Sequence, residues 1–530
     1  MPGRRLAGET ALKLDEARLL SIAPQRKVVL TFTNRVRLDF ARTWTTHVRA
    51  LGMTNYLVGA TDQQALAGLQ KAGIPCFSME TNLPQGEWPW GSPSFKALGP
   101  HKIELIYKSL QWGFEVVITD IDALVLREPF AYMARWPDAA FLTTSDHLGN
   151  TTNDDGLENH GGIHTAFNIG YMFFRKSALP LVEEWRRVIR EQPRSRWDQG
   201  EFNRIARVGW KPSRTDGLSD PRLFWSYQSK LIGGVLNLAL FAGGHNHFVS
   251  QFAPRRGWRP YSVHTTYQYA AAAGKRHRLR EGMVWIDPPA YYDPPGGLLA
   301  FELAVPEALL SPPGGMDTTG HIALINHQLQ QVKSALAVAH TLGRKLIMPR
   351  VTCGYDKAWY PLSSGMPRNN YASRGVFPGA HAYILPIRNC PIDHFLEVGM
   401  LDPVNTIREY SLLSNPRTPP AVLASSVTLA LSKPPPAAVA GSEVERLRKA
   451  STGAKLLRLT NVAHVDSLED GILSSAQAST VRNRFGYVGG SWCCAPSVDK
   501  KKGQPQSAHF RLFAPRRGAR QGWPRGIFTG

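Results

Sequence analysis

Two carboxylates, Asp120 and Asp122, are the residues of this chain whose types and spacing best suit a divalent metal ion. They come directly after an apolar run, residues 115–119, that has the length of a buried strand. Ligands of an open α/β sheet bind outside the carboxyl ends of its strands, so carboxylates there can hold a hard cation, which in turn can hold a diphosphate. The alternative is a strand that ends in a solvated turn, where Asp is simply a good turn residue. The choice between the two depends on the neighbouring segments.

Further polar candidates follow the pair along the chain. Asn168 and Gly170 interrupt the apolar run of residues 167–174, and a glycine inside a strand indicates either the close approach of a ligand or an ordinary bulge. Asp198 and Gln199 precede a helical pattern, where the local sequence favours Asp198 as the N-cap of that helix over a catalytic role. Local pattern alone therefore gives these residues structural roles as readily as chemical ones.

Histidines and a basic run complete the candidates. His245, His247 and His264 lie near glycines and short apolar runs, where a lone histidine is more often structural than a ligand. The basic run of residues 275–280, which begins with Lys275, follows a glycine. Such a run is typical of a solvated helix face, but it can also neutralise a diphosphate.

The elements that must position these residues alternate between strands and helices. Apolar runs and one-sided apolar spacing predict, in order, strand 27–33, helix 39–51, strand 56–59, helix 63–72, strand 75–77 and helix 101–110. This alternation is typical of a mostly parallel sheet with helices on both faces, whose right-handed connections leave the strand ends on one edge. The Asp pair then follows the fourth strand of an α/β sheet.

Length and proline content predict more than one domain in the 530 residues. Prolines at 288–295 and 312–313 indicate a boundary, and a strand at 321–326, a helix at 328–342 and a strand at 345–348 predict a second, smaller α/β unit. We therefore expect residues 26–300 to form the domain with the Asp pair, 318–415 the second unit, and 416–530 a Pro/Ala-rich region with a basic, disordered tail.

Composition narrows the classes of partner. The formal net charge of +21 favours a polyanion, but the sequence has no zinc-finger spacing, no aromatic RNA-binding motif and no basic region that continues into heptads, so we expect no nucleic acid. Five scattered cysteines argue against a disulfide framework or a zinc cluster. The amino terminus has basic residues without an apolar core, so we expect neither a signal peptide nor a membrane anchor there.

Several long segments resemble one family. They include GFEVVITDIDALVLREP, AFNIGYMFF, WDQGEFN and VHTTYQYAAAAGKRHRLREGMVWIDPP, and the likeness covers residues 26–415. Together they closely resemble the extensin arabinosyltransferases of plants and green algae, which belong to the nucleotide-diphospho-sugar transferase group in glycosyltransferase family seventy-seven. The resemblance implies a GT-A fold for residues 26–300 and a Mn²⁺-dependent, retaining enzyme of the Golgi lumen. It would transfer L-arabinofuranose from a UDP donor to arabinosides on hydroxyproline-rich cell-wall glycoproteins. The family has an amino-terminal membrane anchor, which this sequence does not show.

The resemblance also implies roles for individual residues. Asp120 and Asp122 match the metal-binding Asp-x-Asp, and His264 matches the histidine that completes the metal site. The other matches are Asn168, in the donor-pocket strand, Asp198 and Gln199, beside the reacting sugar, and Lys275, on the diphosphate. His245 fits the family pattern and His247 does not. The chemistry is consistent with these roles, because carboxylates suit Mg²⁺ or Mn²⁺ and an added imidazole favours Mn²⁺.

Two alternatives from other classes stay open at this point. A phosphatase of the haloacid-dehalogenase type also places Asp-x-Asp after an apolar strand, although its pair follows the first strand and a Thr or Val usually stands where this chain has Leu124. A glycan-binding protein without activity could share the fold of a glycosyltransferase. Metal-dependent release of UDP from a UDP-sugar would distinguish the three.

Overall fold

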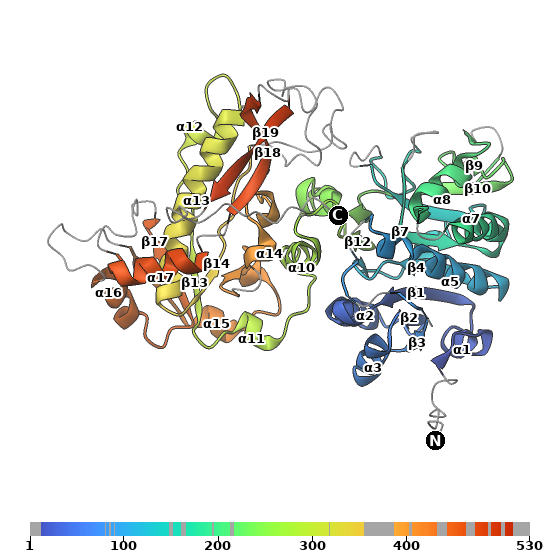
Figure 1. Ribbon diagram of the computed structural model, residues 1–530, viewed down its shortest axis with the longest axis horizontal. Helices are drawn as coiled ribbons and strands as arrows, with labels where there is room; N and C mark the ends of the chain where they lie inside the picture. Colours follow the sequence, from blue (N-terminus) through green and yellow to red (C-terminus); the bar gives the residue numbers. More distant parts are fainter. Residues whose placement is uncertain are drawn as a thin grey trace. The chain divides into compact units, whose positions relative to one another are not determined.

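The computed structural model describes residues 12–79, 81–83, 86–88, 91–147, 152–160, 166–192, 195–212, 217–316, 318–354, 386–401, 405–431, 442–462, 472–485, 489–499 and 504–511. The chain divides into two compact units, one up to Thr266 and one that begins at Tyr267 (Figure 1). The division thus falls before residue 300, because the proline-rich segment that indicated a boundary lies inside the second unit. The disordered tail expected at the carboxyl terminus lies, beyond residue 511, outside the described residues.

The first unit is built on a nine-stranded sheet. Four strands at one side are mutually parallel, and β7 then runs antiparallel to both β4 and β6. The sheet order is β3 (Cys76–Ser78), β2 (Tyr56–Ala60), β1 (Lys27–Thr33), β4 (Glu115–Thr119), β7 (Phe167–Phe174), β6 (Phe141–Ser145), β10 (Leu231–Val235), β9 (Phe224–Ser226) and β8 (Lys211–Pro212). The sheet therefore has the mixed, parallel-rich character of a GT-A fold, and β4 is the fourth strand along the chain, as the sequence predicted.

Helices cover both faces of this sheet, as the alternating pattern predicted (Figure 1). Helices α2 (Leu38–Ala50) and α3 (Gln63–Lys71) lie on one side, and α5 (Gly99–Gln111), α7 (Leu179–Glu191) and α8 (Asp198–Arg207) lie on the other. The apolar spacing of α2 buries Phe40, Trp44 and Val48, the face that the sequence indicated. Trp185 of α7 and Phe202 of α8 belong to the core cluster that packs on β1, β4 and β7.

A second, three-stranded sheet positions the histidine of the site. It contains β5 (Ala123–Val125), which starts directly after the Asp pair, together with β12 (Ser262–His264) and β11 (Phe241–Gly243). In the antiparallel register of β5 and β12, His264 lies opposite Ala123. This pairing brings a residue from the end of the first unit next to the turn that follows β4.

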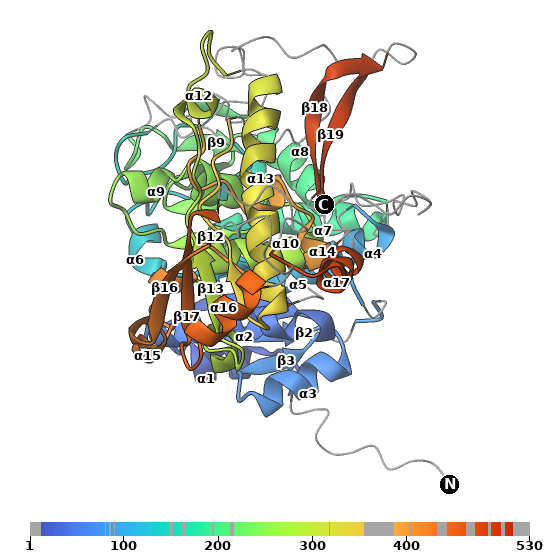
Figure 2. The same cartoon turned by 90° about the vertical axis from the view of Figure 1, so that its left-hand side faces the viewer.

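The second unit contains a five-stranded, all-parallel sheet and a long helix, α13 (Thr318–Thr341). The strand order is β15 (Ile407–Arg408), β14 (Lys345–Ile347), β13 (Leu298–Phe301), β17 (Leu456–Thr460) and β16 (Ser426–Ala430). Helix α13 lies beside β13 and β14 (Figure 2). The sheet therefore continues beyond residue 415, where the sequence analysis ended this unit.

One strand predicted in the second unit is wrong. Residues 321–326 are part of α13, because the apolar run continues with helical spacing into the next turns. In the first turns of the helix, residues buried three or four positions apart include His321, Leu324, Ile325, Gln328, Leu329 and Val332. A short apolar run cannot be assigned to a strand or a helix without this longer register.

A disulfide joins Cys353 and Cys390 in the second unit. The scattered cysteines therefore include one covalent pair, even though their number and spacing did not indicate it. Both residues are buried. Among the helices in the described part of the chain, none is sufficiently long and apolar to cross a membrane.

Candidate active site

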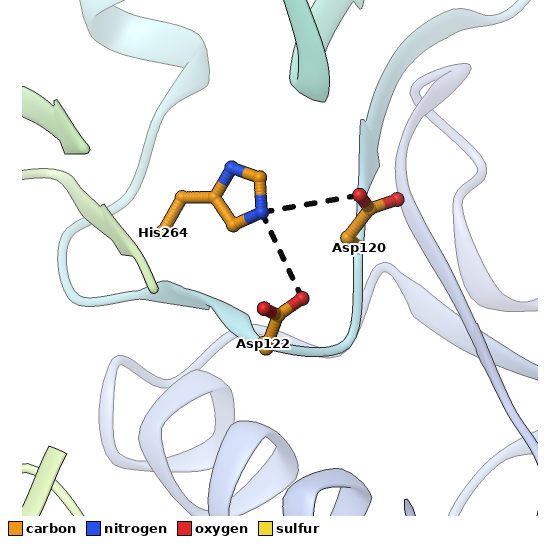
Figure 3. Close-up of side chains that lie close together, drawn as sticks. All are labelled: Asp120, Asp122 and His264. Atoms are coloured by element: carbon orange, nitrogen blue, oxygen red, sulfur yellow. Dashed lines mark ion pairs between the residues drawn. The ribbon is translucent and has the colours of Figure 1, made fainter. Parts of the chain in front are cut away.

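Asp120, Asp122 and His264 converge at the carboxyl end of β4 (Figure 3). Nε2 of His264 lies 3.9 Å from Oδ2 of Asp120 and 3.8 Å from Oδ1 of Asp122. One possible ligand atom from each residue lies within 4.8 Å of the others. Two carboxylates and an imidazole are a donor set for a divalent ion, and the imidazole favours Mn²⁺ over Mg²⁺. The side chains therefore fit a divalent metal ion.

A buried cation holds Asp120 in place. Nζ of Lys102, on α5, donates to Oδ1 of Asp120 at 2.7 Å and to the carbonyl oxygen of Ile169 at 2.7 Å. The Lys102 side chain is 4% exposed, so the ammonium is shielded from water and its interactions are strong. This contact fixes one oxygen of Asp120 and leaves Oδ2 on the side of His264.

Asp122 is fixed by the strand that carries His264. Oγ1 of Thr265 donates to Oδ2 of Asp122 at 2.9 Å, and the backbone N–H of Thr265 donates to the carbonyl oxygen of Asp122. Asp122 is itself buried. The turn after β4 and the end of β12 are therefore tied together on both sides of the metal site.

Gly170 explains how the imidazole fits against the sheet. A Cβ atom at this position would lie 2.1 Å from Cε1 of His264, so only glycine leaves room for the ring. The register of β6 and β7 also shifts between Thr143 and Thr144, which places a bulge in β7 at residues 169–171. The bulge expected as one interpretation of the strand glycine is thus present, and the group that approaches Gly170 is the His264 side chain instead of a ligand.

A second cluster of polar residues, Asp146, Asn168 and Gln199, lies beside the metal site and is called the Asp146 group below. Asp146 follows β6, and its carboxylate accepts from Nδ2 of Asn168 at 2.8 Å and from Nε2 of Gln199 at 2.7 Å. Oε1 of Gln199 accepts from the backbone N–H of Ile169 at 3.3 Å, and Oδ1 of Asn168 accepts from Gly170. Burial raises the pKa of Asp146, although these hydrogen bonds oppose the shift. The two amides are therefore held in fixed orientations by one carboxylate.

The local sequence favoured Asp198 as the N-cap of α8, and the structure shows that this prediction is wrong. Trp197 is the N-cap, with an extended backbone, and Asp198 is already the first helical residue. The carboxylate of Asp198 accepts from the backbone N–H of Gln199 at 2.9 Å. Its Cβ lies so close to Gly99, at the start of α5, that a methyl group there would be only 2.8 Å away. Burial raises the pKa of Asp198 to about 6, while the ammonium of Lys102 partly opposes the shift.

The remaining candidates are not part of the cluster of Asp120, Asp122 and His264 in the described residues. His245 and His247 belong to a single π-helical turn, His245–Val249, after β11. Nδ1 of His245 lies 3.2 Å from Oγ of Ser250, and burial lowers the pKa of His247 to about 4. Lys275 lies on α10 (Ala271–Glu281) in the second unit, so its role at the diphosphate stays a prediction.

Sequence analysis missed three residues of the site: Lys102, Asp146 and Thr265. Lys102 lies in a helix whose pattern gave only an apolar face, and a lysine in such a helix is usually solvated. Asp146 was not among the candidate residues of the sequence analysis. A carboxylate directly after a buried strand was the available signal for Asp146, the same signal that identified the pair after β4.

His264 and His247 should differ in their effect on the metal. We expect the His264→Ala variant to bind Mn²⁺ at least about tenfold more weakly, because loss of a ligand should cost no less than loss of a supporting contact. His247→Ala should leave Mn²⁺ affinity unchanged, although it removes a half-buried ring and should lower the melting temperature. Titration of Mn²⁺ by calorimetry measures both. Equal Mn²⁺ affinities in the two variants would remove His264 from the site.

Lys102 should support the metal without touching it. Lys102→Met leaves Oδ1 of Asp120 without its cation, and we expect Mn²⁺ affinity to fall by about 10- to 100-fold, as for other contacts that orient metal ligands. Lys108→Met is the matched control, because Lys108 lies on the same helix and its side chain is 39% exposed. A similar Mn²⁺ affinity in both variants would contradict the role of Lys102.

Asp198 should make the protein less stable as the pH rises. Its pKa in the folded protein, about 6, is above the value of about 3.9 for an unperturbed Asp, so the folded state binds the proton more tightly. The resulting stability is complete below about pH 4 and is lost through pH 6, a change of about 3 kcal/mol. Urea unfolding at pH 4 and pH 7 should show this change in the wild type and not in Asp198→Asn. An identical pH dependence in the two proteins would contradict it.

Comparison with known proteins identifies the class of this protein as a sugar-transferring enzyme. Residues 51–279 match the family described as nucleotide-diphospho-sugar transferase. Arabinosyltransferase XEG113 of Arabidopsis thaliana is 36% identical over 496 residues, which cover 88% of this chain and 74% of that protein. The chain belongs to this family of arabinosyltransferases and is a glycosyltransferase. The phosphatase alternative is therefore wrong.

Other relatives match shorter stretches. Beta-arabinofuranosyltransferase RAY1 of Arabidopsis thaliana is 24% identical over 168 residues, 31% of this chain and 30% of that protein. Among solved structures, the galactosyltransferase LgtC, in complex with donor and acceptor sugar analogues, covers 47% of this chain and 89% of its own, with 13% identity and a TM-score of 0.26.

Proposed function

We propose that this glycosyltransferase moves L-arabinofuranose from a UDP donor to arabinosides on hydroxyproline-rich glycoproteins, with retention of configuration and with Mn²⁺. The observation that carries the proposal is the convergence of Asp120, Asp122 and His264 beside the Asp146 group, in a chain 36% identical to an arabinosyltransferase. The names of the relatives support arabinose as the sugar.

The three converging side chains would hold the cation, and a bound divalent ion would supply charge that stabilises the leaving diphosphate. Lys102 and Thr265 keep Asp120 and Asp122 in place, so the ligands are positioned before the donor binds. Buried, preorganised contacts of this kind lose little free energy to rearrangement during the reaction. The metal site therefore serves the departure of UDP.

The Asp146 group would serve the sugar. In a retaining transfer the new bond forms on the face from which the diphosphate leaves, so a side chain on the other face stabilises positive charge at C1. We assign this role to Gln199, whose amide can offer an oxygen without forming a stable ester. Asn168 and Asp146 keep the amide of Gln199 in position, and Asp198 orients the start of α8.

We also infer that the enzyme acts in the Golgi lumen. The disulfide between Cys353 and Cys390 supports this location, because structural disulfides persist in oxidising compartments and are rare in the cytosol. The resemblance to extensin arabinosyltransferases implies the same location.

The decisive experiment is an assay of UDP release from UDP-arabinofuranose, with and without Mn²⁺, in the presence of a synthetic hydroxyproline that carries arabinofuranose residues. We expect UDP release that requires Mn²⁺, together with a longer arabinoside detected by mass spectrometry. A protein that binds the arabinoside but releases no UDP would be a glycan-binding protein on the same fold. Turnover with a different UDP-sugar alone would reject arabinose as the donor sugar.

A further inference from the structure

A cavity of about 820 Å³ lies next to the Asp146 group in the first unit. Its volume falls within the range typical of small-molecule sites, about 300–1,000 Å³. Asp146 and Gln199 line it, and Asp146 also lines the smaller cavity that contains Asn168 and His264. The residues to which we assign sugar transfer therefore form part of the wall of the large cavity. Because Asp146 lines both cavities, the large cavity lies next to the metal site.

Apolar side chains form much of the wall of this cavity. Trp197, Phe167 and Val208 contribute to a lining that is mostly apolar. Val208 is 47% exposed. In the described part of the chain it is one of three large apolar side chains that are exposed to solvent, with Met400 and Leu423. An exposed apolar side chain inside a cavity is a feature of binding sites, because a ligand that covers it removes apolar surface from water, which favours binding.

A strained turn holds Val208 in this position. Tyr227, Gln228 and Ser229 have φ values of 46°, 58° and 56°, a left-handed conformation that residues other than glycine adopt at a cost. The turn bonds to the end of α8: the N–H of Gln228 donates to the carbonyl oxygen of Val208, and Oγ of Ser229 donates to that of Gly209. A cost of this kind is retained where the surroundings fix it, often at functional sites.

The cations at the cavity have partners within the protein. Arg204 pairs with Glu201 at 2.8 Å, and Arg207 donates to Oδ1 of Asn203 at 2.9 Å. An anionic ligand would have to compete with these contacts. A neutral ligand with one apolar face and several hydroxyl groups fits the lining better, since it can lie on Trp197 and Val208 while the carboxylate of Asp146 accepts from its hydroxyl groups.

From these observations we propose that the cavity binds the terminal sugar residues of the acceptor glycan. The proposal rests on the proposed function, because it requires that Asp146 and Gln199 serve the transfer of a sugar. The acceptor would lie along α8 between Trp197 and Val208 and present its reacting hydroxyl group at Asp146. Val208, exposed and at the opposite end of α8 from Gln199, would determine acceptor affinity without acting on the donor.

Val208→Asp tests the proposal, with Leu423→Asp as its matched control. Leu423 is 39% exposed and lies in the second unit, so it gives the same chemical change outside the cavity. We expect Val208→Asp to raise KM for a hydroxyproline-linked arabinoside by at least about tenfold. Hydrolysis of UDP-arabinofuranose without acceptor should be unchanged. Val208→Thr, which keeps the shape of the side chain, should have a KM close to that of the wild type.

Each other outcome has a definite meaning. An unchanged KM in Val208→Asp overturns the proposal, and so does a loss of acceptor-free donor hydrolysis in the folded variant, because the cavity would then serve the donor. If the wild type shows no UDP release at all, the proposed function fails. Equilibrium binding of the same arabinoside, weakened by Val208→Asp and not by Leu423→Asp, would still support the cavity as a glycan site.

A measurement on the wild type covers the case in which Val208→Asp does not fold. An arabinoside that carries a photoreactive diazirine should label peptides from residues 197–209 upon illumination, and excess unlabelled arabinoside should prevent the labelling. Specific labelling confined to other segments would overturn the proposal.

Discussion

The Asp122→Asn variant should lose at least about 100-fold of metal-dependent UDP release, because even residues that merely orient metal ligands cost up to that factor in affinity or activity. Asn keeps the shape of the side chain and can still accept from Thr265, but it removes the negative charge that attracts the cation. Asp120→Asn should have a similar effect. Steady-state assays over a range of Mn²⁺ concentrations measure the loss.

Asn is a better substitution than Ala at this position, because Asp122 is a buried residue with a structural hydrogen bond and not a solvated residue at the edge of the sheet. Asp122 is 7% exposed, so Ala would remove the hydrogen bond of 2.9 Å that Oγ1 of Thr265 donates to the carboxylate and leave only the contact of 3.3 Å to the carbonyl oxygen of Asp122. Loss of a hydrogen bond to a charged group costs about 1.5–3 kcal/mol. Asp155→Asn is the control, since its side chain is 65% exposed. Near-normal Mn²⁺-dependent turnover in Asp122→Asn would show that Asp122 is not a metal ligand.

The sequence was sufficient for the part of the fold that local patterns determine. The apolar runs of β1, β2 and β4 and the one-sided apolar face of α2 follow directly from residue spacing, and they place the Asp pair after the fourth strand. The insertion of the antiparallel β7 between β4 and β6 does not follow from spacing, because a buried strand has the same apolar pattern in either direction.

The candidate metal ligands of the site could likewise be named from the sequence, whereas their proximity depends on contacts between segments that are far apart in the chain. Residue types and the family resemblance named Asp120, Asp122 and His264 as metal ligands, and the structure brings the three side chains together. Their proximity depends on the pairing of β5 with β12, which are far apart in the sequence. The sequence could not indicate Lys102 as part of the site, because only tertiary packing turns this helical lysine inward to Asp120.

Gln199→Ala should lower turnover by about 10- to 1000-fold with little change in donor affinity, the pattern expected when a contact is made mainly in the transition state. The structure adds a reason for a large effect. Gln199 bridges Asp146 and the backbone of Ile169, so its loss also frees the carboxylate of Asp146 close to the reacting sugar. Asp198→Asn should lower turnover as well, because it keeps the start of the helix that carries Gln199 but removes a carboxylate that we expect to orient the hydroxyl groups of the sugar.

The informative comparison separates turnover from stability. Gln111→Ala is the matched control, since Gln111 is an exposed amide on α5 whose Nε2 donates to the hydroxyl oxygen of Tyr107 on the same helix. Kinetics with UDP-arabinofuranose and a thermal melt should show Gln199→Ala with a much lower kcat, a KM for the donor close to that of the wild type, and a modest loss of melting temperature. If Gln199→Ala only melts earlier, and turnover per folded molecule stays at the level of Gln111→Ala, then Gln199 supports the fold of α8 and β7 and takes no part in sugar transfer.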